Sequence, residues 1–114
     1  MTETLWTRYA ASWSMPEAER LARLTETVSS EITYTDPNTT LTGIPAFSEY
    51  MSGFQANMPC VGFAIREETD HHQRCLSQWN MVDAAGAVIG TGTSFAVLSD
   101  DGKLAHITGF FGAS

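Results

Sequence analysis

Hydrophobic residues near the start of the chain recur every three or four positions, which is the spacing of one helix face. Trp6, Tyr9 and Trp13 follow this spacing and predict a short amphipathic helix. The run Ser-Met-Pro-Glu at residues 14–17 matches a capping box, in which a serine N-cap is followed three residues later by a glutamate. This run predicts a second helix with Ser14 as its N-cap.

A strand and a third helix complete the first half of the predicted pattern. Residues 31–36 alternate between polar and β-branched or aromatic side chains, so a short strand is expected before the following Pro-Asn turn. On such a strand Tyr34 and Asp36 point to the same side. From Ile44 onward, hydrophobic residues again recur at helical spacing, and this helix should end before Pro59.

The second half of the chain carries the alternating pattern of strands. Four strands are predicted, over residues 61–69, 73–82, 87–98 and 104–111. The turns at residues 83–86 and 99–102 are short and end in glycine, so the last three strands should form an antiparallel meander. Together with the helices, this order indicates an α+β fold in which helices cover one face of a curved antiparallel sheet and leave a pocket between the layers.

The strand predicted at residues 87–98 has two unlike faces. One face would carry small residues, namely Val88, Gly90, Gly92, Ser94 and Ala96, and the other would carry Ile89, Thr91, Thr93, Phe95 and Val97. Small side chains leave room for a ligand or a closely packed helix. If the bulkier face points away from the helices it needs a cover, and a homodimer formed through the outer sheet face is the expected one.

Composition and charge exclude several classes of partner. The chain has 114 residues, of which 43% are hydrophobic, and we expect one domain over residues 1–114. Six basic and thirteen acidic residues give a formal charge of −7, and the basic residues are scattered, so neither nucleic acid nor an anionic membrane is an expected partner. Without a signal-peptide pattern or a long apolar run, a cytoplasmic location is expected. Cys60 and Cys75 are expected to be two buried, reduced thiols.

Several short motifs occur in a specific order along the chain. They are Tyr34-Thr35-Asp36-Pro37, Gly43 before the third helix, Trp79 on a strand, and Asp101-Gly102-Lys103 leading to Ile107-Thr108-Gly109-Phe110-Phe111. This order resembles the SnoaL-like group of the nuclear transport factor 2 superfamily over nearly the whole chain. The resemblance implies a cone-shaped half-barrel with three helices on the concave face of a bent sheet, a cavity inside the cone, and dimerisation through the outer sheet face.

The superfamily includes polyketide cyclases, ketosteroid isomerases, limonene epoxide hydrolases and dehydratases, so the site residues must decide the activity. Resemblance to the isomerases implies that Asp36 is a proton-shuttling base, that Tyr9 stabilises an enolate oxygen, and that Ser94 stands where the isomerases have a protonated aspartate. A serine can donate a hydrogen bond but is not a neutral carboxylic acid, so efficient steroid isomerisation is not expected.

Asp36 has two interpretations from the residues alone. A carboxylate at a strand end, beside Tyr34 and facing an apolar cavity, can act as a general base. An Asp before Pro-Asn can instead accept backbone N–H groups in an Asx-turn, without a catalytic role. Both interpretations stay open, and the environment of Asp36 in the fold should separate them.

The remaining expected lining is aromatic and apolar, and it consists of Trp13, Tyr34, Phe54, Met58, Trp79 and Phe111. Such a wall suits a small, flat, apolar molecule with one or two polar atoms. No metal site is expected at Asp70-His71-His72, because adjacent side chains diverge on an extended chain. Arg66, Asp70 and Arg74 do not reproduce the Asp-Arg-Asp set of the epoxide hydrolases, and His106 is expected at a surface or interface.

Three functions therefore remain open. The first is an enzyme without a cofactor that transfers a proton on a small apolar carbonyl compound, with Asp36 as the base and Tyr9 or Ser94 polarising the oxygen. The second is a non-catalytic module that binds a hydrophobic metabolite in the same pocket. A third, an interaction domain that uses the sheet face, would require a filled cone.

Overall fold

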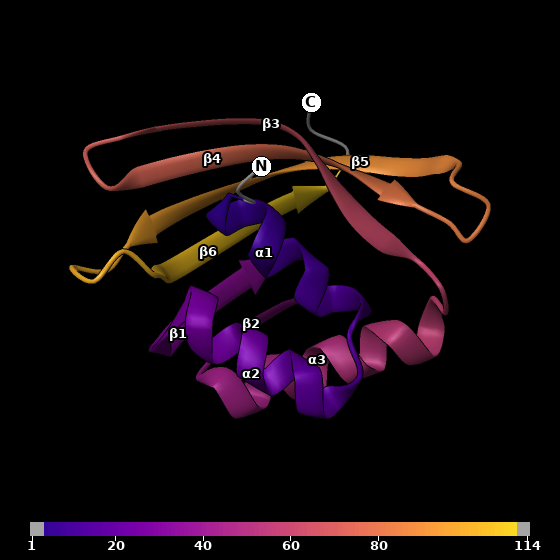
Figure 1. Cartoon of the computed structure of the whole chain (residues 1–114), viewed down its shortest axis with the longest axis horizontal. Helices are drawn as coiled ribbons and strands as arrows, with labels where there is room; N and C mark the ends of the chain where they lie inside the picture. Colours follow the sequence, from indigo (N-terminus) through magenta and orange to yellow (C-terminus); the bar gives the residue numbers. More distant parts are fainter. Residues whose placement is uncertain (1–3, 112–114) are drawn as a thin grey trace.

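The computed structural model describes residues 4–111. In this part of the chain there are three α-helices and six strands: two helices come before the first strand, and the third lies between the second and third strands. The helical segments are α1 (Leu5–Ala11), a 3₁₀ turn (Ser12–Ser14), α2 (Glu17–Thr27) and α3 (Ile44–Asn57). The strands are β1 (Val28–Asp36), β2 (Thr39–Thr42), β3 (Gly62–His71), β4 (Arg74–Val82), β5 (Val88–Leu98) and β6 (Leu104–Phe111). Figure 1 shows β3 to β6 arching over α1, with α2 and α3 below it.

The six strands form one curved, open sheet in the order β2-β1-β6-β5-β4-β3. The predicted α+β fold, with helices packed against the sheet, is confirmed. One neighbouring pair departs from the expected antiparallel arrangement, because β1 and β6 run parallel. No hairpin joins these two strands, and a long connection permits either direction, so local turn signals could not reveal this pairing.

Two local details at the helices and turns differ from the sequence prediction. The N-cap of α2 is Pro16, whereas Ser14 belongs to the preceding 3₁₀ turn. A proline disfavours helical geometry at the residue before it, and Met15 is accordingly extended, with φ −94° and ψ 147°. Strand β2 was not predicted, because its four residues, Thr-Thr-Leu-Thr, are too few to show an alternating pattern.

A buried arginine holds the helical layer together. Arg20 of α2 is 1% exposed. Its guanidinium donates to Ser48 Oγ at 2.9 Å and Ser52 Oγ at 2.5 Å, both on α3, and to the Met15 carbonyl at 3.1 Å. Because buried polar groups are costly when unpaired, these bonds fix how α2 lies against α3.

The two faces of β5 differ as predicted over residues 92–96, but not at Val88, which was assigned to the small face and is 55% exposed at the start of the strand. Ala96 is fully buried and Ser94 is 8% exposed, whereas Phe95 is 38% exposed and Ile89 is 48% exposed. The small face therefore looks toward the helices and the bulkier face looks outward. Gly92, on the small face, lies directly under the ring of Trp79, since a Cβ at position 92 would come 2.2 Å from Trp79 Cζ2.

The prediction of two buried thiols is correct for Cys75 and wrong for Cys60, which is exposed. Cys60 follows the end of α3 in a left-handed conformation, with φ 63°, and so lies in the turn rather than under the sheet. Burial raises the pKa of the Cys75 thiol to about 11, and the negative charges of Asp70 and Glu68 add to this effect. Among the described residues, no helix is long and apolar enough to span a membrane.

Candidate functional site

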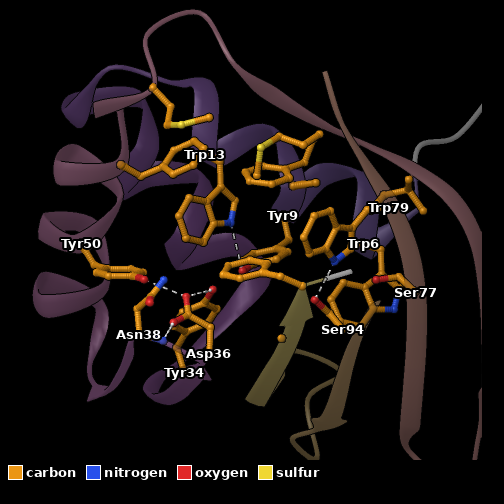
Figure 2. Close-up of a pocket in the computed structure, with 18 of the residues that line it drawn as sticks. Trp6, Tyr9, Trp13, Tyr34, Asp36, Asn38, Tyr50, Ser77, Trp79 and Ser94 are labelled. Atoms are coloured by element: carbon orange, nitrogen blue, oxygen red, sulfur yellow. Dashed lines mark hydrogen bonds between the residues drawn. The ribbon is translucent and has the colours of Figure 1, made fainter. Parts of the chain in front are cut away.

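A pocket of about 460 Å³ opens between the helices and the inner face of the sheet. Figure 2 shows aromatic side chains from the helices and strands converging on this space. The structure places all nine predicted site residues in its wall, namely Tyr9, Trp13, Tyr34, Asp36, Phe54, Met58, Trp79, Ser94 and Phe111. Of the described residues that line it, Asp36 is the one with a formal charge.

Asp36 combines both environments that the sequence left open. Its Oδ1 accepts hydrogen bonds from the backbone N–H groups of Asn38 at 2.8 Å and Thr39 at 3.1 Å, which is an Asx-turn. Its Oδ2 accepts from the hydroxyls of Tyr34 and Tyr50, each at 2.8 Å. The side chain is nevertheless only 7% exposed and faces the pocket. Asp36 is thus a turn residue and a pocket residue at once.

The two tyrosines reach Asp36 from different elements. Tyr34 precedes Asp36 by two residues on β1, so both side chains lie on the same face of the sheet, as predicted. Tyr50 comes from α3 and was not among the predicted site residues. Its position three residues after Phe47, on the inward face of the predicted helix, is the signal that could have identified it.

Tyr9 and Trp13 form a second polar pair. Trp13 Nε1 donates to the Tyr9 hydroxyl oxygen at 3.1 Å, so the hydroxyl proton of Tyr9 remains available to an acceptor in the pocket. Burial raises the pKa of Tyr9 above its usual range, the Trp13 hydrogen bond lowers it in part, and the charge of Asp36 raises it further. Tyr9 is therefore a neutral hydrogen-bond donor at physiological pH.

The tyrosines on Asp36 are also held in the protonated state. Burial is the main cause that raises the pKa of Tyr34, and the negative charge of Asp36 contributes. Burial and the hydrogen bond to Asp36 raise the pKa of Tyr50 to about 12. Both tyrosines therefore stay protonated, and their hydroxyls donate hydrogen bonds to the Asp36 carboxylate.

Ser94 repeats the arrangement of Tyr9 on the floor of the pocket. Trp79 Nε1 donates to Ser94 Oγ at 3.0 Å, which leaves the serine proton free for another acceptor. Gly109 lies opposite Ser94 in the sheet register. A Cβ at position 109 would come 3.6 Å from Ser94 Oγ and 3.8 Å from both Asp36 Cβ and the Tyr34 hydroxyl. The missing side chain therefore leaves open the space between Ser94 and Asp36.

Two further polar atoms are buried in the pocket wall, and one of them, the Ser77 hydroxyl oxygen, has no hydrogen-bond partner among the described residues. The other is Trp6 Nε1. The Trp6 N–H does influence Cys75, because it lowers the pKa of that thiol and offsets part of the effect of burial. Ser77 shares a face of β4 with Trp79, so the period of two along the strand was its available signal.

The histidines lie away from the pocket. His71 and His72 are exposed at the turn between β3 and β4, and His106 is exposed on β6. The rings of His71 and His72 do not diverge as expected, because their Nδ1 atoms are 3.1 Å apart. The reason is the turn itself, in which His72 has a φ of 49° rather than an extended value. Among residues 4–111, no three potential metal ligands form a cluster.

Comparison with known proteins relates this architecture to a family. The model of the SnoaL-like domain matches residues 6–107. A structure from Agrobacterium tumefaciens, assigned as an isomerase of the SnoaL-like family, superposes with a TM-score of 0.89 at 17% identity, over 96% of this chain and 95% of that chain. The comparison with curated proteins yields no match.

Two other solved structures bear names that suggest different activities. A protein from Sinorhizobium meliloti, assigned as a polyketide cyclase, has a TM-score of 0.74 and 16% identity, over 95% of this chain and 94% of that chain. A protein from Kribbella flavida, assigned as a ketosteroid isomerase, has a TM-score of 0.70 and 12% identity, over 96% of this chain and 76% of that chain. At these identities the likeness concerns the fold, which is NTF2-like.

Proposed function

Because the chain belongs to the SnoaL-like domain family, we propose that its pocket binds a small apolar carbonyl compound and that Asp36 transfers a proton on it, without a cofactor. The observation that supports this proposal is the pairing of one carboxylate with separate neutral donors in a largely aromatic pocket. Asp36 would take a proton from the carbon next to the carbonyl. Tyr9 or Ser94 would donate a hydrogen bond to the oxygen as it becomes an enolate.

The hydrogen bonds of Asp36 set a condition on this chemistry. A carboxylate has about four acceptor positions, and here four donors occupy them. A substrate proton can reach an oxygen only if one donor leaves. Tyr50 is the donor best placed to do so, because it is half-buried and approaches from a helix rather than from the turn itself.

The test uses 1-tetralone, a flat cyclic ketone, as the probe. We expect the wild-type protein to catalyse exchange of its α-protons in D₂O, measured by NMR. Asp36→Asn should slow the exchange at least about 100-fold, which is the lower range for loss of a general base. The variant should still show a rise in melting temperature with 1-tetralone, because the pocket keeps its shape. Unchanged exchange in Asp36→Asn would reject the base assignment.

A second candidate function is the binding of a hydrophobic metabolite without turnover. The observation that favours it is the complete set of four hydrogen bonds on Asp36, which a purely structural turn residue would also make. Thermal stabilisation by 1-tetralone without exchange in either protein would identify this function. Absence of any interaction with 1-tetralone would contradict both candidates for this class of ligand.

A further inference from the structure

We infer that the Asp36 end of the pocket binds an organic cation without N–H groups, such as a quaternary ammonium group. This inference goes beyond the proposed proton transfer and needs only the pocket, not the base role of Asp36. It is carried by three features: an uncompensated buried charge, aromatic rings around it, and the absence of a free acceptor position on the carboxylate.

The first feature is electrostatic. The Asp36 carboxylate accepts four hydrogen bonds, all from neutral donors, and it is 7% exposed. The ion pairs of the described residues join Arg8 and Arg23 to Glu26, and neither involves Asp36. Within residues 4–111, no Lys, Arg or His lines the pocket. Neutral donors stabilise the anion but do not cancel its charge, so the cavity is attractive to cations and hostile to anions.

The second feature is the set of rings beside this charge. The centroids of Trp13, Tyr34 and Tyr50 lie 5.8 to 6.1 Å from one another, and all three rings belong to the pocket wall. Phe54 adds a fourth ring, 5.4 Å from Trp13. Figure 2 shows Trp13, Tyr34 and Tyr50 grouped around Asp36. Aromatic faces attract cations, and the attraction grows when water is excluded.

The orientation of two of these rings is coupled to the carboxylate. Both the Tyr34 and Tyr50 hydroxyls donate to Asp36 Oδ2 at 2.8 Å. The polar edges of these rings therefore face the anion. One face of the Tyr34 ring is stacked on Phe47, with centroids 4.5 Å apart, so it is the half-buried Tyr50 ring that leaves carbon surface for a ligand. A preformed arrangement of this kind loses little side-chain entropy when a ligand binds.

The third feature selects among cations. A primary ammonium must exchange its hydrogen bonds with water for new ones, and unpaired N–H groups in a buried site are costly. The four acceptor positions of Asp36 are already occupied. A quaternary ammonium has no N–H group and interacts through charge and methyl contact alone, so it suits this site without displacing Tyr50 or the turn.

The experiment compares choline with two probes: its neutral carbon isostere 3,3-dimethylbutan-1-ol, and ethanolamine, which has the same hydroxyethyl chain but a primary ammonium group. Titrations followed by tryptophan fluorescence and NMR should show choline binding about tenfold more tightly than either of the others, the range expected of a desolvated cation–π site. Equal binding of choline and the isostere, or of choline and ethanolamine, would overturn the inference. So would an absence of choline binding.

Two variants at Tyr50 make the test specific. Tyr50→Phe keeps the ring but frees one acceptor position on Asp36, so ethanolamine should bind more tightly and the preference for choline should shrink. Tyr50→Leu removes the ring and should weaken choline binding about tenfold. An unchanged preference for choline over ethanolamine in both variants would contradict the proposed cation site. This test does not depend on an Asp36 variant, which could fail to fold.

The same titrations separate this inference from the proposed function. Binding of 1-tetralone without binding of choline leaves the proposed function standing and rejects the cation site. Binding of choline without proton exchange on 1-tetralone supports the cation site and rejects the proton transfer. Failure of both ligands to bind rejects both.

Discussion

Position 109 shows how a single residue controls the space in which a ligand would lie. Gly109 is on β6, and its missing side chain opens the gap between Ser94 and Asp36. Gly92, on the neighbouring strand, has a different role, because the Trp79 ring already fills the place of its side chain. Gly109 is thus needed to keep the pocket open, whereas Gly92 is needed so that the Trp79 ring can pack.

We predict that Gly109→Ala leaves stability within about 1 kcal/mol of the wild type but weakens binding of 1-tetralone about tenfold. The new methyl would make ordinary contacts of 3.6 to 3.8 Å while occupying the gap. Thermal unfolding and fluorescence titration measure the two effects. Gly92→Ala is the matched control and should cost about 2 to 4 kcal/mol, because its methyl would overlap the Trp79 ring and come 2.6 Å from the Phe110 carbonyl. Equal stability of the two variants would contradict this division of roles.

At the scale of elements, the hairpin between β3 and β4 is built with unusual turn residues. His71 and Arg74 are register partners, so the turn has two residues, His72 and Gln73. Both have left-handed φ angles, of 49° and 63°. A two-residue turn of this handedness matches the twist of the strands, but Asn-Gly is the sequence that adopts it most readily. The hairpin is therefore imposed by the pairing of its strands.

We predict that the double variant His72→Asn, Gln73→Gly raises the free energy of unfolding by about 1 kcal/mol, because glycine has no steric penalty at positive φ. The melting temperature should rise by about 4 °C for a change of this size. Gly102→Ala provides the opposite control. Gly102 has a φ of 81°, and a Cβ there would have no neighbour within 4 Å, so alanine should lower the free energy of unfolding through backbone strain alone. A melting temperature at or below that of the wild type in the double variant would argue against strain at this turn.

At the scale of the whole molecule, the outer sheet face is open. Phe95 is 38% exposed and Phe110 is 51% exposed. They lie on neighbouring strands, where Phe110 is the register partner of Thr93 and Phe95 that of Thr108, so both rings belong to the same outward face. We propose that a second copy of the chain covers this face, as the bulky side of β5 suggests.

Sedimentation at micromolar concentration should therefore give twice the mass of the chain, and Phe95→Glu should give the mass of a monomer, because a buried unpaired charge at the interface is costly. The variant should keep its fold, since position 95 points away from the core. The control is Val88→Glu, which introduces the same charge at another exposed residue, at the start of β5. Sedimentation of the wild type as a monomer would reject the homodimer.

The sequence alone determined the features that depend on neighbours along the chain. Period-two and helical spacing located α3 and the four later strands to within about two residues, and they placed Tyr34 and Asp36 on one side of β1. The contrast between the two faces of β5 was also readable, because it depends only on alternation. These patterns are local, so no knowledge of packing was needed.

Only the tertiary structure decided what depends on residues far apart in the chain. The parallel pairing of β1 with β6, the exposure of Cys60 and the placement of the Tyr50 hydroxyl on Asp36 have no local signature. Each follows from how whole elements dock, and many dockings satisfy the same hydrophobic pattern. Asp36 shows the difference best: its Asx-turn was open to prediction from Asp-Pro-Asn, whereas its saturated, uncompensated charge in an aromatic pocket required α3 and the sheet to be in place.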